Sequence, residues 1–377
     1  MPVRTRTVTE LMSGAGHEQV LFVAEHDVGL RAIIAIHSTA LGPSLGGVRF
    51  WRYPSEREAL ADVLALAAAM TRKAAIAGLY QGGGKAVVLW DEPDRPRPRP
   101  LLEALGRAID GLGGRYLAAE DVGATTADMD ALDDVTPWVT GVSESRGGSG
   151  DPSPVTAYGV LHAMHAVCAH LDGDRALHGK RVVVQGAGHV GTHLARLLVD
   201  AGAHVVVSDL FDARAQALAR ELGVESVPAE VAVTTPCDIL SPNALGGVLD
   251  APIVGRLRCR AVVGAANNQL ATDGVDVMLA ERGVLFAPDV VVSAGGIVNI
   301  AEEFTGYDRA RALARVAGIE AMLTRVIDDA AARGVTPQRA AQDLADRRVR
   351  EEGAGRRFTP GDPAAWTNGA PLTRLRP

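Results

Sequence analysis

Hydrophobic and polar residues along the first 150 positions follow periods that are typical of strands and then of helices. Residues 19–24 and 30–38 are rich in Val, Ile and Phe and predict two strands separated by a short turn at 27–29. Ser55, followed three residues later by Glu58, forms a capping box that predicts the start of a helix. Apolar residues then recur at helical spacing and predict one buried face: Leu60, Val63, Leu64, Ala67 and Met70.

Strands and helices continue to alternate after this helix. The glycine-rich segment 81–85 leads into an apolar strand at 86–90, and the proline-rich segment 93–100 predicts an exposed, extended loop. A docking motif for a proline-binding partner is the alternative interpretation of that loop. A helix at 101–112, a strand at 115–118 and a helix starting near Thr126 follow. This alternation is typical of an α/β domain.

A second α/β unit is predicted after the glycine-rich segment 147–150, which is a candidate hinge. Ser153 is expected to cap the next helix, with Pro154 in its first turn, where a missing N–H costs nothing. Residues 182–185 predict the first strand of this unit. From about 351 to 377 the periodicity is lost, and Gly, Pro and Arg dominate, so this tail is expected to be disordered.

Composition and charge exclude several classes of protein. The chain has 377 residues, 47% of them hydrophobic and 22% charged, which is globular, and its formal net charge of -7 argues against a nucleic-acid-binding protein. The most apolar stretch, 283–301, contains Pro288, Asp289, Gly295 and Gly296 and is no membrane span. The first ten residues lack the apolar run of a signal peptide.

Cysteine and histidine usage completes this picture. The three cysteines, Cys168, Cys237 and Cys259, are odd in number and have no paired spacing, so we expect reduced thiols in a cytoplasmic protein. The ten His and three Cys show no ligand spacing, and no metal site is predicted.

Lysine is rare in this chain, which makes each lysine informative. Of 38 basic residues only three are Lys, namely Lys73, Lys85 and Lys180. Arginine stays protonated at any accessible pH, whereas a buried lysine can lose its proton and act as a base. Lys73 lies three residues after Met70, at the buried end of the predicted helix. The alternatives are chance and, for Lys73, a favourable interaction of a cation with the helix C-terminus.

A dinucleotide-binding fingerprint occurs at Gly186-Ala187-Gly188-His189-Val190-Gly191. A strand precedes it, a helix at 189–201 follows, and a second strand at 204–208 ends at Asp209, 18 residues after the last glycine. Glycines of this spacing let the backbone approach a pyrophosphate at the N-terminus of the helix. The acidic residue accepts hydrogen bonds from the adenosine ribose hydroxyls and favours NAD over NADP. Arg214, a few residues later, leaves some tolerance for NADP open.

Lys85 and Asp121 form a second candidate site. Glycines 82–84 have no side chains, so we expect a substrate to approach the backbone beside Lys85. In a cleft shielded from water, desolvation would lower the pKa of the Lys85 ammonium toward the working pH. The segment 118–123 places carboxylates, Asp121 among them, at the end of a predicted strand, where α/β sheets bind ligands. The alternative for Asp121 is a structural role before the helix at Thr126.

These segments together resemble those of the Glu/Leu/Phe/Val dehydrogenase superfamily, most closely its leucine and valine dehydrogenases. The resemblance runs in order from about residue 16 to residue 350. The matching motifs are 41–49, 70–73, 82–85, 119–123, 150–159, 186–191, 264–270 and 294–296.

The resemblance implies an NAD-dependent oxidative deamination of an L-amino acid to a 2-oxo acid and ammonia, and the reverse reaction. It implies that Lys73 binds the substrate carboxylate, that Lys85 is the base that activates water, and that Asp121 carries protons to and from the amino nitrogen. Two of the three lysines fall on these positions, and Lys180 is expected to be a solvated residue. The remaining substrate-binding residues implied are Gly46, Gly47, Met70, Leu45, Ala119, Asn268, Ile297 and Ile300.

The cofactor-binding residues implied extend beyond the glycine fingerprint and Asp209 to Thr156, Ala265, Ala266 and Asn267. Leu45, Ala119, Ile297 and Ile300 would line an apolar side-chain pocket without a cation, which favours an aliphatic branched-chain amino acid of valine or leucine type. Ser293 departs from the family pattern, in which Asn usually precedes Ala-Gly-Gly, and this puts one polar contact to the nicotinamide side in doubt. His189 occupies the variable position of the phosphate loop.

The fold that follows is α/β with two domains separated by a cleft. Residues 1–150, completed by returning helices at 331–350, would bind the substrate and mediate homo-oligomerisation; residues 151–330 would form a Rossmann NAD-binding domain. Partners are expected to be small molecules, with neither nucleic acid nor membrane. The alternatives are a phenylalanine- or tryptophan-type dehydrogenase and a non-catalytic nucleotide-binding relative, which would be expected to lose Lys73, Lys85 or Asp121.

Overall fold

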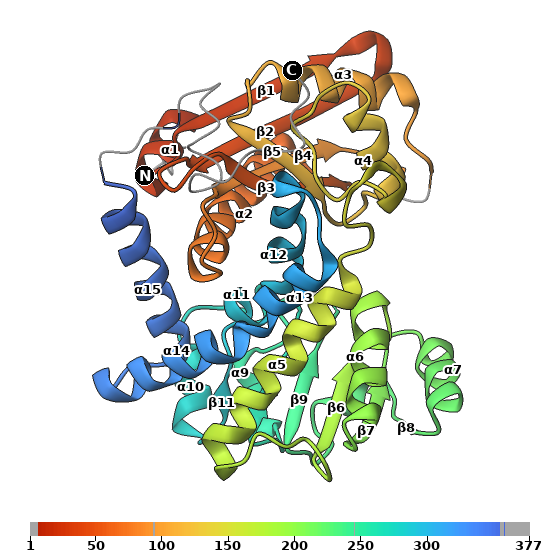
Figure 1. The fold of residues 1–377 in the computed structure, drawn as a ribbon, viewed down its shortest axis with the longest axis vertical. Helices are drawn as coiled ribbons and strands as arrows, with labels where there is room; N and C mark the ends of the chain where they lie inside the picture. Colours follow the sequence, from red (N-terminus) through yellow and green to blue (C-terminus); the bar gives the residue numbers. More distant parts are fainter. Residues whose placement is uncertain (1–6, 93–94, 245, 355–357, 359–377) are drawn as a thin grey trace, which may run out of the picture. The chain divides into compact units, whose positions relative to one another are not determined.

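The chain divides into two compact units in the computed structural model, which describes residues 7–92, 95–244, 246–354 and 358. Unit 1 comprises the described residues within Met1–Asp151, Ile300–Arg309 and Ala345–Pro377. Unit 2 comprises Pro152–Asn299 and Ala310–Leu344, again as far as they are described. Each unit contains a sheet with helices, which confirms the predicted α/β class (Figure 1).

The chain returns to unit 1 twice, whereas one return after about residue 330 was expected. The first return is fixed by Glu303, whose Oε1 accepts hydrogen bonds from the backbone N–H groups of Gly141 at 2.9 Å and Ser149 at 2.8 Å. The second is fixed by Asp346, which pairs with Arg72 at 3.0 Å, and by Arg348, which donates to the carbonyl of Ala75 at 2.7 Å. Both returning segments are therefore held in unit 1 by polar contacts with residues that are distant in sequence.

Unit 1 is built on a five-stranded mixed sheet in the order β1-β2-β4-β3-β5. Strand β2 pairs antiparallel with β1 and β4, while β3 lies between β4 and β5 and pairs parallel with both. The elements are α1 (Val8–Ala15), β1 (Gln19–Glu25), η1 (His26–Val28), β2 (Leu30–Ser38), β3 (Ser44–Trp51), α2 (Glu56–Ile76), β4 (Gly82–Leu89), α3 (Arg99–Asp110), β5 (Tyr116–Glu120), α4 (Thr126–Asp133), η2 (Glu144–Arg146) and η3 (Glu302–Thr305).

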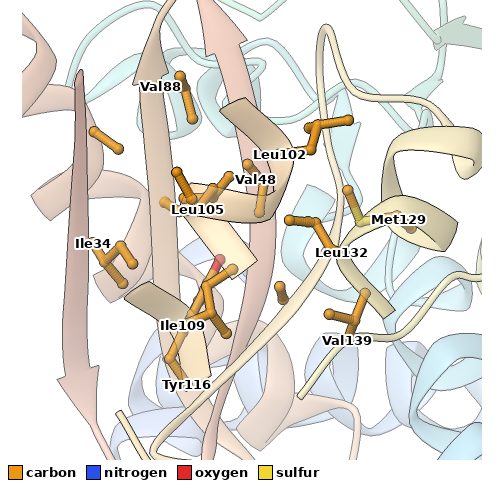
Figure 2. Close-up of a cluster of buried hydrophobic side chains, with 14 of the residues drawn as sticks. Ile34, Val48, Val88, Leu102, Leu105, Ile109, Tyr116, Met129, Leu132 and Val139 are labelled. Carbon is orange, nitrogen blue, oxygen red and sulfur yellow. The ribbon is translucent and has the colours of Figure 1, made fainter. Parts of the chain in front are cut away.

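Both faces of this sheet are buried by helices. Alternate residues of a strand point to opposite faces. Ile33 and Ala35 of β2 accordingly pack in one cluster with the apolar face of α2, around Val63. Ile34 belongs to the other cluster, which Figure 2 shows between the strands and helices α3 and α4, with Leu105 of α3 close to the sheet. Two-sided burial explains the near-continuous apolar sequence of these strands.

Unit 2 contains a six-stranded sheet in the order β11-β10-β9-β6-β7-β8, and all of its paired strands are parallel. In chain order this is 6-5-4-1-2-3, the strand order of dinucleotide-binding Rossmann domains. The elements are α5 (Ser153–Asp172), β6 (Arg181–Gln185), α6 (His189–Asp200), β7 (His204–Ser208), α7 (Asp212–Leu222), β8 (Glu225–Ser226), α8 (Ala229–Ala232), β9 (Ile239–Pro242), α9 (Ala251–Arg256), β10 (Ala261–Val262), α10 (Val275–Glu281), β11 (Leu285–Phe286), α11 (Asp289–Val292), α12 (Gly295–Ala301), α13 (Arg309–Ala317), α14 (Ile319–Arg333) and α15 (Pro337–Glu352), with the ends of α12 and α15 falling in unit 1.

Several local predictions need correction. The glycines at 82–84 lie inside β4 rather than before it, and α3 begins at Arg99, inside the segment that was expected to be an extended loop. Ser153 is the first residue of α5, and its N-cap is Pro152, which has no side-chain donor or acceptor. Helix α15 continues to Glu352, and most of the tail expected to be disordered lies outside the described residues. No helix among those described is long and apolar enough to cross a membrane.

Candidate active site

Lys85 and Asp121 form a buried ion pair in unit 1. Lys85 lies in the middle of β4, and its Nζ is 2.9 Å from Oδ1 of Asp121, which directly follows β5. The Lys85 side chain is only 4% exposed and that of Asp121 16%. The structure thus brings together the two residues that the sequence analysis assigned to proton transfer.

Two glycines of β3, Gly46 and Gly47, leave the space in which Asp121 and the strand of Lys85 come close to one another. A Cβ on Gly47 would lie 2.5 Å from Cβ of Asp121, and a Cβ on Gly46 would lie 1.7 Å from the carbonyl oxygen of Gly84, so any side chain would force the strands apart. The hydroxyl of Tyr116 donates to the carbonyls of Gly46 at 2.8 Å and Gly47 at 3.2 Å. The predicted substrate-binding glycines therefore shape the site from within the protein.

The glycines of β4 have a different role from the one expected. The space that a Cβ would occupy is filled by protein, namely by Ser38 at Gly82, by Thr71 at Gly83, and by Ser44 and Tyr116 at Gly84. A Cβ on Gly83 would lie 2.1 Å from the backbone nitrogen of Thr71. Gly83 thus makes room for helix α2, and Gly82 and Gly84 make room for groups of the other strands, so protein takes up the space beside all three glycines.

The helix that carries the predicted carboxylate-binding lysine packs against the strand of Lys85. Lys73 lies in the last turn of α2, two residues after Thr71, and Met70 precedes Thr71; both are partly buried. By contrast, Lys180 pairs with Asp172 at 2.8 Å near the surface of unit 2.

Arg49 is a site residue that the sequence analysis missed. Its Nε donates to Oδ2 of Asp121 at 2.8 Å, and its Nη1 lies 3.0 Å from Oδ2 of Asp62. The Tyr53 hydroxyl donates to the same oxygen of Asp62 at 2.5 Å. Arg49 follows Gly47 by two residues on one strand, so both lie on the face of the sheet at which Asp121 lies, but that spacing alone does not indicate that Asp121 is there.

Burial and charge oppose one another in this cluster. Burial lowers the pKa of the Lys85 ammonium below its ordinary value, although the neighbouring Asp121 carboxylate works against this. Burial alone would raise the pKa of Asp121, but the Lys85 ammonium and the Arg49 guanidinium outweigh it and lower that pKa to about 2. Asp121 therefore stays ionised, and Lys85 is the group whose proton is more easily lost than usual.

The glycine fingerprint of unit 2 has the geometry of a phosphate-binding turn. Gly186 follows β6 with a positive φ of 104°, and a Cβ on Gly191 would lie 1.8 Å from the carbonyl oxygen of Gly186, so helix α6 packs closely on the strand. A Cβ on Gly188 would meet nothing within 4 Å, and no side chain caps α6. An accessible backbone at an uncapped helix N-terminus fits the pyrophosphate of a dinucleotide. Ala187, His189 and Val190 complete this turn, and His189 is exposed.

Asp209 ends β7 beside this turn, as predicted from its spacing. Its Oδ2 accepts from the backbone N–H of Ala187 at 2.8 Å, and its Oδ1 accepts from that of Phe211 at 2.9 Å. These bonds fix the carboxylate against the phosphate-binding turn, and each oxygen keeps further lone pairs for a ligand hydroxyl.

The other predicted cofactor residues lie in two segments of unit 2, and Asn268, which was predicted to bind the substrate, lies in one of these segments. Asn268, with a φ of 52°, is the one non-glycine residue with positive φ in the described chain; its N–H donates to Oδ2 of Asp289 at 2.5 Å, and its side chain is exposed together with that of Asn267. The preceding Ala265 and Ala266 are held by Asn243 and Pro242.

Thr156 and Ser293 lie near the start of α12. A Cβ on Gly296 would lie 3.0 Å from Oγ1 of Thr156, so this helix start packs directly on Thr156. The Ser293 hydroxyl donates to the carbonyl of Asp289 at 2.6 Å. The hydroxyl proton of Ser293 is thus used in a bond to the backbone. It does not supply the hydrogen bond that an asparagine amide at this position would donate toward the nicotinamide side.

The residues predicted to line the side-chain pocket are all buried, but they do not lie in one unit. Leu45 of β3 and Ala119 of β5 belong to neighbouring strands of unit 1 and are 0% and 3% exposed. Ile300 belongs to the same unit, where its Cγ2 lies 3.9 Å from the Cβ position of Gly141. Ile297, 5% exposed, belongs to unit 2.

Comparison with known proteins gives consistent matches over most of the chain. Residues 17–137 match the family described as Glu/Leu/Phe/Val dehydrogenase, dimerisation domain, and residues 147–213 and 209–352 match Glutamate/Leucine/Phenylalanine/Valine dehydrogenase. The leucine dehydrogenase of Thermoactinomyces intermedius is 44% identical, covering 91% of this chain and 93% of the relative. The valine dehydrogenase of Streptomyces virginiae is 45% identical, with 89% and 94% covered.

A solved structure is similar over the same range. The L-tryptophan dehydrogenase from Nostoc punctiforme superimposes with a TM-score of 0.79 at 36% sequence identity, covering 92% of this chain and all of that one.

Proposed function

The chain belongs to the Glu/Leu/Phe/Val dehydrogenase family, as its sequence motifs predicted, and we propose that it is an amino acid dehydrogenase that oxidatively deaminates aliphatic branched-chain L-amino acids with NAD. The products are a 2-oxo acid, ammonia and NADH, and the reaction is reversible. The alternative of a non-catalytic relative is disfavoured because the chain retains Lys73, Lys85 and Asp121.

The observation that carries this proposal is the buried pair of Lys85 and Asp121, 2.9 Å apart. A lysine that burial makes easier to deprotonate can take a proton from water, which an arginine cannot do. Leucine and valine dehydrogenases at 44% and 45% identity support the same chemistry.

In the proposed reaction each residue has one task. Lys73 holds the substrate carboxylate, and Lys85 removes a proton from the water that attacks the imino carbon. Asp121, with a pKa of about 2, relays protons to and from the substrate nitrogen without retaining them, and Lys85 holds the proton between steps. NAD, when bound, accepts the hydride that leaves the α-carbon.

Unit 2 supplies the proposed NAD site. The turn from Gly186 to Gly191 and the uncapped start of α6 would hold the pyrophosphate, and Asp209 would accept hydrogen bonds from the adenosine ribose. A fixed carboxylate there repels a 2′-phosphate, which favours NAD over NADP. Arg214 stacks on the Phe211 ring at 4.7 Å, and this contact competes with its use as a phosphate ligand.

The substrate class follows from the proposed pocket. Leu45, Ala119, Ile297 and Ile300 are apolar and offer no cation, so a glutamate side chain would leave its charge unpaired at a cost of several kcal/mol. Isoleucine at 297 and 300 leaves less room than smaller residues would. The similarity to a tryptophan dehydrogenase keeps an aromatic amino acid as the second candidate.

A panel of the twenty amino acids, assayed for NADH formation, tests this proposal. We expect the highest kcat/KM with valine or leucine and only partial discrimination among valine, leucine and isoleucine, because one methylene in an apolar pocket is worth about 1–3 kcal/mol. Faster turnover of phenylalanine or tryptophan would show that the pocket residues are wrongly assigned. No turnover of any amino acid would refute the proposed function.

The proposal also includes self-association through unit 1. The family match over residues 17–137 is described as a dimerisation domain, which supports a homo-oligomer. Light scattering on the purified chain measures its mass directly. A strictly monomeric protein at micromolar concentration would contradict this part of the proposal.

A further inference from the structure

We propose that Arg49 is a positioning residue of the reaction, which fixes the Asp121 carboxylate through both protonation states of Lys85. This inference rests on the function proposed above. It concerns a residue that contacts neither water nor substrate in the scheme given there and acts through Asp121 and Lys85.

The Asp121 carboxylate is held at both of its oxygens by different cations. Lys85 Nζ lies 2.9 Å from Oδ1, and Arg49 Nε donates to Oδ2 at 2.8 Å. Two contacts from different strands fix the rotation of the carboxylate as well as its position. The strand order sets this arrangement. Strand β3, which carries Arg49, lies between β4, which carries Lys85, and β5, which is followed by Asp121.

Arg49 is itself held in place. Its Nη1 pairs with Oδ2 of Asp62 on α2 at 3.0 Å, and Tyr53 donates to that same oxygen. The Arg49 side chain is 19% exposed and that of Asp62 32%, so these contacts are partly shielded from water. One guanidinium therefore bridges two carboxylates through two nitrogens of a rigid plane, whereas a lysine would have a single nitrogen on a flexible stem.

The need for such a residue follows from the proposed cycle. Lys85 changes its charge whenever it takes or returns a proton, and its attraction for Asp121 is lost each time it becomes neutral. Arginine cannot be deprotonated in a protein, so the bond from Arg49 persists. Without it, Asp121 would lose its orientation at the step in which it must reach the substrate nitrogen.

The charge of Arg49 also acts on Lys85 itself. Three charged groups have the largest electrostatic effect on the Lys85 ammonium: Asp121 after β5, Arg49 on β3 and Asp62 on α2. Of these, Arg49 alone has the same charge as Lys85. Arg49 therefore lowers the pKa of Lys85, whereas Asp62 raises it. Removing the charge of Arg49 should therefore make Lys85 harder to deprotonate, and removing the charge of Asp62 should make Lys85 easier to deprotonate.

Four variants and a control test the inference through kcat and the pH profile of kcat/KM with the best substrate of the panel. Arg49→Met should lower kcat by about 100-fold and move the acidic limb about one unit to higher pH. Arg49→Lys keeps the charge but replaces the rigid guanidinium by one nitrogen on a flexible stem, which should hold Asp121 less firmly, so kcat should fall about 10-fold with an unmoved limb. Asp62→Asn should move the limb to lower pH, and Tyr53→Phe should leave it in place.

The control is Arg31→Met, which removes an exposed arginine of β2 that pairs with Asp91 at 3.6 Å and should retain wild-type kinetics. NADH binding measured by fluorescence should be equal in all variants. If Arg49→Met keeps kcat within about threefold of the control and the limb does not move, the inference is wrong.

The variants remain informative if Arg49→Met does not fold. Arg49→Lys and Asp62→Asn then decide the matter. General loosening of the site would lower activity at every pH without moving the limb, whereas the inference expects Asp62→Asn to move the limb to lower pH and Arg49→Lys to lower kcat with the limb in place. An inactive wild-type enzyme overturns the proposed function and this inference together. An active wild type with an unaffected Arg49→Met variant overturns this inference alone.

Discussion

Replacing Lys85 by arginine separates the two contributions of a lysine in this site. Lys85→Arg keeps a cation beside Asp121 and removes only the amine that can lose its proton, whereas Lys85→Met removes both. If Lys85 is the base that activates water, the two variants should be equally inactive. If it is only an ion-pair partner for Asp121, the arginine variant should remain active.

The expected loss of activity is large compared with the expected loss of stability. General base catalysis contributes about 10²- to 10⁴-fold, or about 3–5 kcal/mol of activation free energy. In Lys85→Met, Asp121 keeps its 2.8 Å contact with Arg49, so the free energy of unfolding should fall by about 1–2 kcal/mol rather than the 3–5 kcal/mol of a fully unpaired carboxylate. The larger arginine side chain should cost about 1–3 kcal/mol through overpacking.

The assay is NADH formation with valine and leucine, with thermal melting and NADH titration as controls. A change of about 1–3 kcal/mol lowers the melting temperature by about 2–12 °C (about 2–4 °C per kcal/mol), so both variants should be folded at a moderate assay temperature. Retention of more than about a tenth of wild-type kcat by Lys85→Arg would refute the base assignment.

Three further predictions concern other parts of the site. Gly47→Ala should lower kcat at least about tenfold, because the added Cβ would lie 2.5 Å from Cβ of Asp121. Gly255→Ala is the control and should leave kcat unchanged, because a Cβ there would meet nothing within 4 Å. Steady-state kinetics of both variants tests this. Asp209→Ala should narrow the preference for NAD over NADP, and equal kcat/KM for both cofactors in the wild type would contradict the role of Asp209. The depressed pKa of Asp121 stabilises the folded state above its unfolded pKa of about 4, so denaturant titrations should show the advantage of wild type over Asp121→Asn shrinking between about pH 5 and pH 2; a constant difference would exclude this linkage.

The dinucleotide-binding fingerprint was predictable because its parts are close in sequence. Gly186, Gly188, Gly191 and Asp209 lie on one strand–helix–strand segment, and each spacing reports a local requirement of the backbone. The strands and helices around it were predicted for the same reason, since periodicity is a local property of the chain.

Arg49 could not be found in this way, because its role depends on strand order. Arg49 reaches Asp121 beside Lys85 because β3 lies between β4 and β5 in the sheet. No local pattern in the sequence specifies that strand order. The misinterpretation of glycines 82–84 has the same origin. The groups that fill the space beside them, such as Thr71 and Tyr116, come from other elements, and a sequence pattern shows that a side chain is missing but not what takes its place.

The fate of the α-hydrogen of valine tests the central claim most directly. L-Valine deuterated at the α-carbon is incubated with the wild-type enzyme and NAD, and the reduced cofactor, the 2-oxo acid and ammonia are quantified together. The account predicts reduced cofactor that carries the deuterium, with one 2-oxo acid and one ammonia formed per NADH. Reduced cofactor without deuterium, or deuterated cofactor without equivalent ammonia, would contradict oxidative deamination by this protein.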